Sequence, residues 1–315
     1  MSNNKQRYVV SSVSIWKWAS EPVGGSCPQC RAPGGPPACA WATLVVLSAY
    51  QREEVVVDYE NLVCERDGEV ATITLSRPDR RNCLSSEVLG ELEHAVRTTG
   101  EHDDLAGIIL ASTGPVFSSG HDLAEMAVMT EDGLRNLFDV CTAAMKSLAE
   151  VPQVVIARVQ GLATAAGAQL AASADLIVAS EEARFSTPGG KGGLFCHTPM
   201  VAVARQIGRK RAAELALTGG AIDAATALQW GLVNRVVPAA DLEQATLEFV
   251  GYATRGSRYA KGLGKATMYA QMDMTFDDAY ELAAEVMSRA AAHGDGREWP
   301  TAFVEKRRPE WTHEG

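Results

Sequence analysis

Two glycine-containing turns hold the residues best suited to chemistry. The first, residues 118–122 (SSGHD), has Gly120, which permits an unusual backbone angle and leaves the His121 N–H free to point at a ligand. The second, residues 163–167 (ATAAG), opens a predicted helix whose first N–H groups lack partners within the helix. Two such donors can stabilise negative charge that develops on a carbonyl oxygen, and a helix N-terminus adds partial positive charge. The turns together predict an oxyanion hole. The alternative is two tight turns whose small residues serve packing.

The elements that must position these turns follow an α/β pattern. Short apolar or alternating runs predict strands over residues 61–65, 69–76, 106–111, 154–159 and 175–179, the first two joined by a hairpin at Asp67-Gly68. Helical spacing of apolar residues predicts helices over residues 85–99, 134–149, 201–207, 210–217, 224–230, 242–253, 276–292 and 300–307. Val236-Val237 is a further short strand candidate. Buried strands that alternate with helices indicate a largely parallel sheet, in which ligands collect beyond the carboxyl ends of the strands.

The chain divides by composition into three expected parts. Residues 1–57 are rich in Gly, Pro and Cys without a helical or strand period, and we expect a poorly ordered extension. The shortage of acidic residues before Glu53 leaves a mitochondrial presequence open, and a misassigned upstream translation is the third option. Residues 58–255 are expected to form an α/β core and residues 256–315 a C-terminal helical region.

Composition excludes several classes of protein. With 315 residues, 46% apolar and 22% charged, the chain can bury one substantial core. A net charge of −10 argues against nucleic-acid binding, which needs a basic face. The longest uncharged apolar stretch, residues 36–50, is shorter than the roughly 20 residues that cross a bilayer, so no membrane span is expected.

Cysteine usage points to a reducing compartment. The seven cysteines are odd in number and scattered, unlike a secreted disulfide scaffold, and we expect a cytoplasmic protein with the mitochondrial matrix as the alternative. Cys27 and Cys30 have zinc-knuckle spacing, but a structural site needs about four ligands and only Cys39 lies near. We therefore expect no metal site.

Several ordered motifs resemble the crotonase (enoyl-CoA hydratase/isomerase) superfamily. They are RPDRRNCLS (77–85), FSSGHDL (117–123), GLATAAGAQLAAS (161–173), DLIVAS (175–180), ARFSTPG (183–189), LTGGAIDAATALQWGLVNRVVP (217–238) and TAFVEKRRPEW (301–311). The resemblance implies a ββα spiral core with a helical C-terminal trimerisation region. It also implies a homotrimer, or a homohexamer formed as a dimer of trimers.

The same resemblance implies an acyl-coenzyme A site. The oxyanion donors would be the N–H groups of His121 and Ala166. Coenzyme A would enter as part of the substrate, with no tightly bound cofactor, and would lie along Arg81, Asn82, Cys83 and Leu84 and beside Asp122 and Leu123. Lys306, of the same chain or of a neighbouring subunit, would approach the adenosine phosphate. Two arginine- and lysine-rich clusters suit a polyanion, with a solvated charged face as the alternative: Arg77, Arg80 and Arg81, and Lys306, Arg307 and Arg308.

The sequence departs from the family pattern at two positions. Active hydratases of this type carry glutamates where this chain has Gln169 and Gly189. Gln169 can orient a water but cannot take its proton, and Gly189 has no side chain. Efficient hydration is therefore not expected.

Other residues near the turns are candidates to replace the glutamates. His121 is the first, because its imidazole titrates near neutrality and a similar Gly-His-Asp sequence occurs in methylmalonyl-CoA decarboxylase, a superfamily member. Cys196 and His197 come next as nucleophile and base, or else as a small buried residue and a helix cap. Met268, Tyr269, Met272 and Met274 are expected to pack or to line an acyl-chain tunnel.

Two functions remain open on these grounds. The first is an enzyme of lyase or isomerase type that forms an enolate or oxyanion from an acyl-CoA, as in decarboxylation, hydrolysis or isomerisation. The second is a catalytically weak acyl-CoA-binding or regulatory protein of fatty-acid metabolism. The retained turns favour the first function, whereas Gln169 and Gly189 favour the second.

Overall fold

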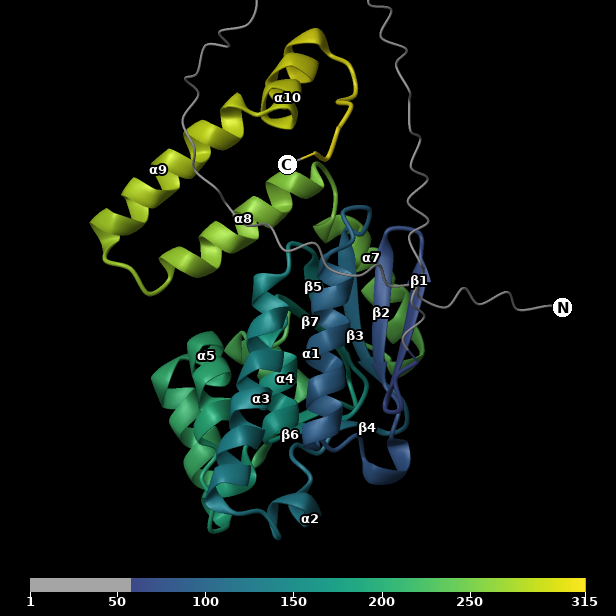
Figure 1. Cartoon of the computed structure of the whole chain (residues 1–315), viewed down its shortest axis with the longest axis vertical. Helices are drawn as coiled ribbons and strands as arrows, with labels where there is room; N and C mark the ends of the chain where they lie inside the picture. Colours follow the sequence, from purple (N-terminus) through teal and green to yellow (C-terminus); the bar gives the residue numbers. More distant parts are fainter. Residues whose placement is uncertain (1–57, 315) are drawn as a thin grey trace, which may run out of the picture. The chain divides into compact units, whose positions relative to one another are not determined.

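Two β-sheets form the centre of the described part of the chain, residues 58–314 of a computed structural model (Figure 1). The first has six strands, in the order β1 (Leu62–Asp67), β2 (Val70–Leu75), β3 (Gly107–Ser112), β5 (Val154–Val159), β7 (Leu176–Ser180) and β10 (Arg235–Val237). The second has four, in the order β4 (Val116–Ser118), β6 (Leu162–Thr164), β8 (Arg184–Ser186) and β9 (Ala221–Asp223). The expected extension 1–57, with Cys27, Cys30 and Cys39, lies outside the described residues.

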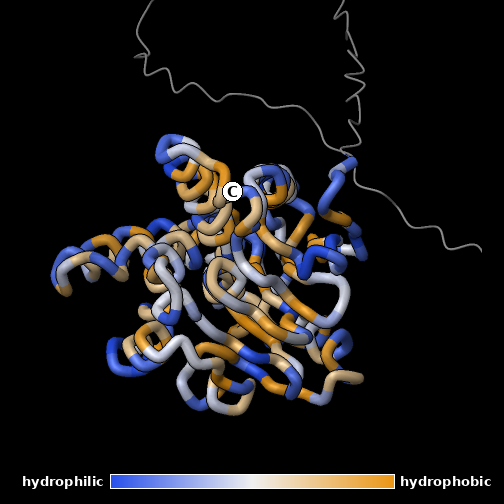
Figure 2. Tube along the Cα trace, turned by 90° about the horizontal axis from the view of Figure 1, so that it is seen from below, coloured by the Kyte–Doolittle hydropathy of each residue, from blue (hydrophilic) through white to orange (hydrophobic). Residues whose placement is uncertain are grey.

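The first sheet follows the sequence prediction. β1 and β2 form an antiparallel hairpin in which Asp67 pairs with Val70, and Gly68 takes the positive φ of 57° that this tight turn uses. All other neighbours in this sheet are parallel. The central strands are almost wholly buried. Figure 2 colours the trace by hydropathy and shows apolar segments in the interior of the described chain. The predicted strands and the largely parallel sheet are confirmed to within two residues at each end.

The second sheet was not predicted, because its strands are three residues long and show no period. It nevertheless positions both turns. β4 and β6 are parallel neighbours, with Ser118 opposite Ala163. The first turn follows β4 and the second follows β6. Because the two strands are parallel, both turns begin at the same end of the sheet, where the carboxyl ends of these strands lie.

Helices surround the sheets and make up most of the C-terminal part. They are α1 (Ser86–Gly100), α2 (Leu123–Met126), α3 (Glu131–Glu150), α4 (Ala166–Ser173), α5 (His197–Thr218), α6 (Ala224–Trp230), α7 (Leu242–Ala253), α8 (Arg258–Gln271), α9 (Phe276–Ala292) and α10 (Gly294–Glu305). Three short 3₁₀ helices are η1 (Pro78–Arg80), η2 (Pro188–Lys191) and η3 (Ala239–Asp241). The Ser85 hydroxyl accepts a hydrogen bond from the Val88 N–H at 3.3 Å and is the N-cap of α1.

The structure corrects two helix predictions. Helix α8 was missed, because Gly262 and Gly264 lower its intrinsic helix propensity. Helix α10 begins at Gly294, ahead of the predicted residue 300. The two helices predicted over residues 201–207 and 210–217 are confirmed as the two halves of α5, which are separated at Gly208, whose φ of 75° and ψ of 165° are not helical.

A buried ion pair joins α8 to the core. Lys265 Nζ lies 2.8 Å from Asp175 Oδ2 and donates to the carbonyls of Leu148 and Gln153. The Tyr269 hydroxyl donates to Asp175 Oδ1 at 2.7 Å. These groups satisfy one another, so the contact compensates for the weak propensity of the helix.

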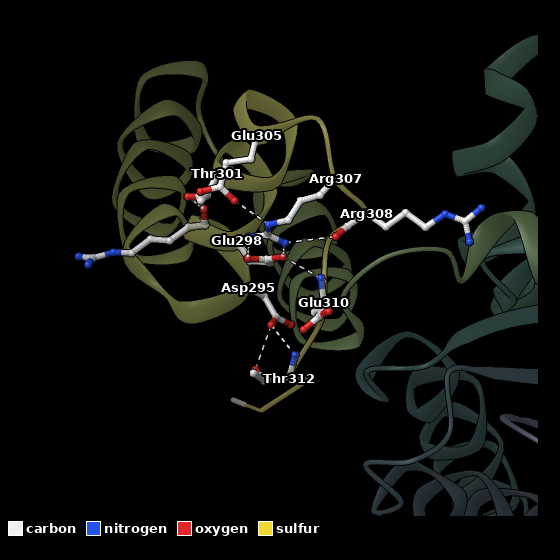
Figure 3. A network of polar contacts seen from close by, with 9 residues as sticks. Asp295, Glu298, Thr301, Glu305, Arg307, Arg308, Glu310 and Thr312 are labelled. Atoms are coloured by element: carbon white, nitrogen blue, oxygen red, sulfur yellow. Dashed lines mark hydrogen bonds and ion pairs between the residues drawn. The ribbon is translucent and has the colours of Figure 1, made fainter.

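Helices α8, α9 and α10 lie together at one end of the subunit (Figure 1). The chain after α10 is held by polar contacts, in which Asp295 accepts hydrogen bonds from the N–H and hydroxyl of Thr312, and Glu298 pairs with Arg307 (Figure 3). Large apolar side chains are exposed on these helices: Met268, Met272, Met274, Phe276, Tyr280, Met287, Trp299, Phe303 and Val304. Across residues 58–314, no helix is long and apolar enough to cross a membrane.

Candidate active site

The first turn is held by an isolated bridge to the chain before α1. The Leu84 N–H donates to the Gly120 carbonyl at 2.8 Å, and the Asp122 N–H donates to the Leu84 carbonyl at 3.3 Å. In this parallel pattern the residue between the two bonding partners, His121, directs its own N–H away from Leu84. Gly120 adopts a φ of 84°, which favours glycine. The His121 N–H therefore lies on the side of the turn that faces away from Leu84.

The second turn presents a free N–H at the start of α4. Ala165 has a φ of 51°, and its N–H donates to the Ser186 carbonyl at 2.9 Å. Ala166 is the first residue of the helix, and its N–H has no acceptor among the described residues. The helix N-terminus adds partial positive charge at this point.

Close glycine contacts bring the two turns together. A Cβ built on Gly120 would lie 3.1 Å from the Ala166 nitrogen and 2.9 Å from the Ala165 Cβ. A Cβ on Gly167 would lie only 2.3 Å from the Ser118 carbonyl oxygen, nearer than any real side chain comes. Larger residues at either position would force the turns apart.

A cavity of about 550 Å³ lies against both turns, within the size range of small-molecule sites. It is lined by Ser119, His121, Leu123, Met126, Phe138, Thr164, Ala165, Ala166, Pro188, Gly189, Gly192, Gly193, Leu194, Phe195, Cys196, His197, Thr198 and Pro199. Among these described lining residues there is no Asp, Glu, Lys or Arg. Both residues that carry a free N–H group thus line one largely apolar space, and no carboxylate is among its described lining residues.

The His121 ring is the main titratable group of the cavity. Its Nδ1 lies 3.4 Å from the Leu84 carbonyl oxygen, and its edge packs on Phe138 at a centroid distance of 5.4 Å. Its Nε2 is buried without a partner among residues 58–314. Burial lowers the pKa of His121 below its usual value of 6.5, although the Leu84 carbonyl and Glu125 act in the opposite direction. The ring is therefore neutral at pH 7.

Gln169 lies one helical turn beyond Ala166 on α4. Its side chain is 5% exposed, and its Oε1 is buried without a partner in the described part of the chain. Gln169 is not among the residues that line the cavity. The structure therefore brings His121 and Ala166 to one space and leaves Gln169 out of its lining.

Gly189 has no room for a side chain. A Cβ there would lie 2.1 Å from the Leu194 carbonyl oxygen and 2.9 Å from Cys196 Sγ. The chain from Leu194 to Cys196 folds back over this glycine, so the position is closed by backbone. An acidic side chain could not be restored here without moving that segment.

The predicted coenzyme A segment, residues 81–84, has both exposed and internal side chains. Arg81 is exposed and adopts a φ of 53°. Asn82 is buried, and its side-chain amide donates to the carbonyls of Thr113 and Val116, each at 2.8 Å. These two hydrogen bonds hold residues 81–84 against residues 113–116. Leu84 is fully buried. The side chains of Asn82 and Leu84 therefore serve packing, and Arg81 is free to meet an anion.

Cys83, the third residue of this segment, lies against Asp122. The Cys83 thiol donates to Asp122 Oδ2 at 3.4 Å, and Arg80 Nη2 lies 3.0 Å from the same oxygen. Asp122 also caps α2 by accepting from the Ala124 N–H at 3.0 Å. Burial works to raise its pKa, but hydrogen bonds to the carboxylate, with the charge of Arg80, outweigh it and lower the pKa. Leu123, next along, is 73% exposed and lines the cavity.

The chain does not bring Lys306 to this segment. Lys306 follows directly after α10, which lies at the opposite end of the described chain from α2 in Figure 1. The neighbouring Arg307 is paired with Glu298 and Glu305, so part of the expected basic cluster is neutralised within the chain. Lys306 of the same chain therefore lies away from residues 81–84.

The cysteine and histidine at the start of α5 differ in exposure. Cys196 is buried, and burial raises the pKa of its thiol, as expected for a small packed residue. His197 is exposed, and its ring packs on Phe195 at 5.2 Å. The predicted helix cap is wrong, because Cys196 occupies the N-cap position and His197 is the first helical residue.

The predicted acyl-chain tunnel residues lie elsewhere. Tyr269 binds Asp175, and Met268, Met272 and Met274 are between 44% and 57% exposed on or after α8. None of them lines the cavity. The cavity wall is instead formed by Met126, Phe138, Leu194 and Phe195, which sequence reasoning missed because apolar side chains carry no local sign of chemistry.

The fold and these two turns define the class of the protein. The chain matches the family described as Enoyl-CoA hydratase/isomerase over residues 65–314, and it belongs to that family. The resemblance inferred from the sequence motifs is thereby confirmed.

Particular relatives are similar over most of their length. Mitochondrial enoyl-CoA hydratase domain-containing protein 3 of Mus musculus is 43% identical over 250 residues, which are 79% of this chain and 83% of that protein. The crystal structure of human enoyl Coenzyme A hydratase domain-containing protein 3 has a TM-score of 0.76 at 42% identity, covering 80% of this chain and 100% of that one. That of an enoyl-CoA hydratase from Mycobacterium smegmatis has a TM-score of 0.78 at 41% identity, covering 80% and 98%. The expected crotonase-type α/β fold with C-terminal helices is confirmed.

Proposed function

We propose that the chain binds an acyl-CoA thioester with its carbonyl oxygen between the N–H groups of His121 and Ala166. The observation that carries this proposal is that His121 and Ala166, each with a free N–H, line one cavity and belong to turns in direct contact. A thioester carbonyl gains negative charge when an enolate or tetrahedral intermediate forms. Two preorganised donors, one of which lies at a helix N-terminus, stabilise that charge more than they stabilise the ground state.

The proposed reaction is enolate-forming chemistry of lyase or isomerase type without efficient hydration. Hydration needs one group to take a proton from water and another to deliver one. The cavity is lined by no carboxylate, Gln169 cannot take a proton, and Gly189 has no side chain. The neutral His121 ring, with its unpartnered Nε2, is the group proposed to hold or deliver a single proton.

Coenzyme A is proposed to bind as part of the substrate. Arg81 and Arg80 offer positive charge beside the cavity, and Asp122 fixes Arg80 through their 3.0 Å ion pair. Lys306 of a neighbouring subunit is proposed to complete the phosphate contacts in a homotrimer or homohexamer. The proposed location is the cytoplasm, with the mitochondrial matrix as the alternative that the name of the mouse relative supports.

The test is isothermal titration of the full chain with crotonyl-, malonyl- and methylmalonyl-CoA, with product followed by mass spectrometry. Binding with turnover of one member supports the proposal and identifies the reaction. Binding without turnover supports the second function, an acyl-CoA-binding or regulatory protein, which the closed position at Gly189 favours. No binding of any member would refute the coenzyme A assignment.

A further inference from the structure

A second hollow lies on helix α5, outside the cavity described above. Its volume is about 480 Å³, and it is lined by Phe195, Met200, Ala204, Arg205, Arg209, Ala212, Ala213, Ala216 and Leu217. We call it the α5 groove. Apart from two exposed arginines, every lining residue is apolar, and four of them are alanines. The surface therefore suits a hydrocarbon segment.

The bend in α5 accounts for the groove. Gly208 is not helical, so the helix turns between its two halves. Ala204 lies on the first half, and Ala212, Ala213 and Ala216 lie on the second. Because alanine has only a methyl side chain, the space along the bend stays unfilled.

Phe195 is the one residue shared by the linings of the α5 groove and the active-site cavity, as far as the described residues show. Its aromatic side chain is therefore the common wall between the two spaces. The ring is half-buried and rests against His197 at a centroid distance of 5.2 Å. Its displacement would break one ring contact and would leave the main hydrophobic core in place.

The backbone on both sides of Phe195 is held in place. A Cβ on Gly189 would lie 2.1 Å from the Leu194 carbonyl oxygen and 2.9 Å from the Cys196 nitrogen, so both chain neighbours of Phe195 are in tight contact with this glycine. Free space begins only two residues before Phe195, because a Cβ on Gly193 would meet nothing within 4 Å. A change of position at Phe195 is therefore a rotation of its side chain and needs no movement of the backbone.

We propose that Phe195 is a gate that determines how long an acyl chain the site accepts. With the ring in the observed position, the acyl chain ends in the active-site cavity. When the ring turns aside, the cavity opens into the α5 groove, which takes the distal methylene groups of a long chain. This inference rests on the proposed binding of acyl-CoA, and it replaces the tunnel expected at Met268, Met272 and Met274.

The experiment measures affinity for saturated acyl-CoAs with 4, 8, 12 and 16 carbons by isothermal titration, below their micelle concentrations. Each additional buried methylene group is worth about a fourfold gain in affinity. Filling the groove with Ala213→Phe should leave the four-carbon affinity unchanged and weaken the 16-carbon ligand at least tenfold. Opening the wall with Phe195→Ala should raise the ratio of 16-carbon to four-carbon affinity at least tenfold. Val201→Ala, on an exposed site of α5 outside the groove, is the control.

Two outcomes would contradict the proposal that Phe195 is a gate to the α5 groove. If Ala213→Phe binds the 16-carbon ligand as the unmodified protein does, the groove takes no acyl chain. If Ala213→Phe changes only the oligomeric state in light scattering, the groove is a contact between copies of the chain. Binding of the four-carbon ligand in either case leaves the proposed function intact, whereas absence of binding at every length overturns both proposals.

Discussion

The contact between Gly167 and Ser118 yields the sharpest prediction about the site. A methyl group at Gly167 would lie 2.3 Å from the Ser118 carbonyl oxygen and 2.8 Å from its carbonyl carbon. Carbon atoms in good contact lie about 3.5–4.0 Å apart, so something must move by about an ångström. The obstacle is backbone of β4, which pairs with β6 and cannot rotate away as a side chain could. Gly167→Ala should therefore separate the two turns.

The size of the effect follows from two opposing terms. Overpacking of this kind costs about 1–3 kcal/mol of stability. Replacing a helical glycine by alanine contributes about 0.8–1 kcal/mol in the other direction. Gly90→Ala on α1 is the matched control, because a Cβ there meets nothing within 4 Å. It should gain stability from the helix term alone, so the two variants should differ by about 1–3 kcal/mol.

Urea denaturation of both variants measures the free energy of unfolding, and turnover of the acyl-CoA found by titration measures the site. A shift of about 1 Å in a catalytic group costs about 100-fold in rate. We expect that loss in Gly167→Ala and full activity in Gly90→Ala. Equal stability and equal turnover in the two variants would show that this close contact does not hold the turns together.

Three further predictions concern the donor, the ion pair and the C-terminal segment. Ala166→Pro removes one N–H at the first helical position and should lower turnover about 100- to 1000-fold, whereas Ala166→Gly keeps the donor and should retain activity. Lys265→Ala leaves the buried Asp175 without a partner of opposite charge and should cost about 3–5 kcal/mol in denaturant unfolding, whereas the exposed Arg135→Ala should cost less than about 0.5 kcal/mol. Burial works to raise the pKa of Asp295, but hydrogen bonds from the Ser257 and Thr312 side chains and the backbone outweigh it and lower the pKa from 3.8 to about 2. The contribution of the carboxylate to stability is therefore present above pH 3.8 and is lost as the pH falls towards 2. Asp295→Asn should lower the melting temperature at pH 7, and this difference from the unmodified protein should disappear near pH 2.

Each of these three predictions would be contradicted by a specific result. Full turnover in Ala166→Pro with a normal melting temperature would remove that N–H from the mechanism. An Arg135→Ala variant as unstable as Lys265→Ala would show that burial does not distinguish the two pairs. A melting difference for Asp295→Asn that persists unchanged to pH 2 would show that the ionised carboxylate is not what holds Thr312.

The sequence predicted most of the first sheet and the outer helices, because these depend on local patterns. The alternating apolar residues of β2 and the helical spacing of Val88, Leu92 and Val96 on α1 are properties of short stretches of chain. Local patterns failed at α8, where the contacts of Lys265 with the core outweigh the weak propensity of two glycines. They also failed at the second sheet, whose strands are too short to show a period.

The sequence by itself determined the candidate donors of this protein. Gly120 before His121 and a run of small residues at the start of a helix produce free N–H groups wherever they occur, because backbone angles and helix ends are local. The lack of a carboxylate at Gln169 and Gly189 is likewise a matter of residue type.

The tertiary structure alone decided which of these groups meet. Residues 121 and 166 lie far apart along the chain, and only the packing of Gly120 and Gly167 against the opposite turn brings them to one cavity. Tertiary contacts elsewhere in the chain closed the space at Gly189, set Phe195 between two hollows and kept Lys306 of the same chain away from residues 81–84. Such contacts depend on how whole elements fit together, and no local pattern of residues encodes that fit.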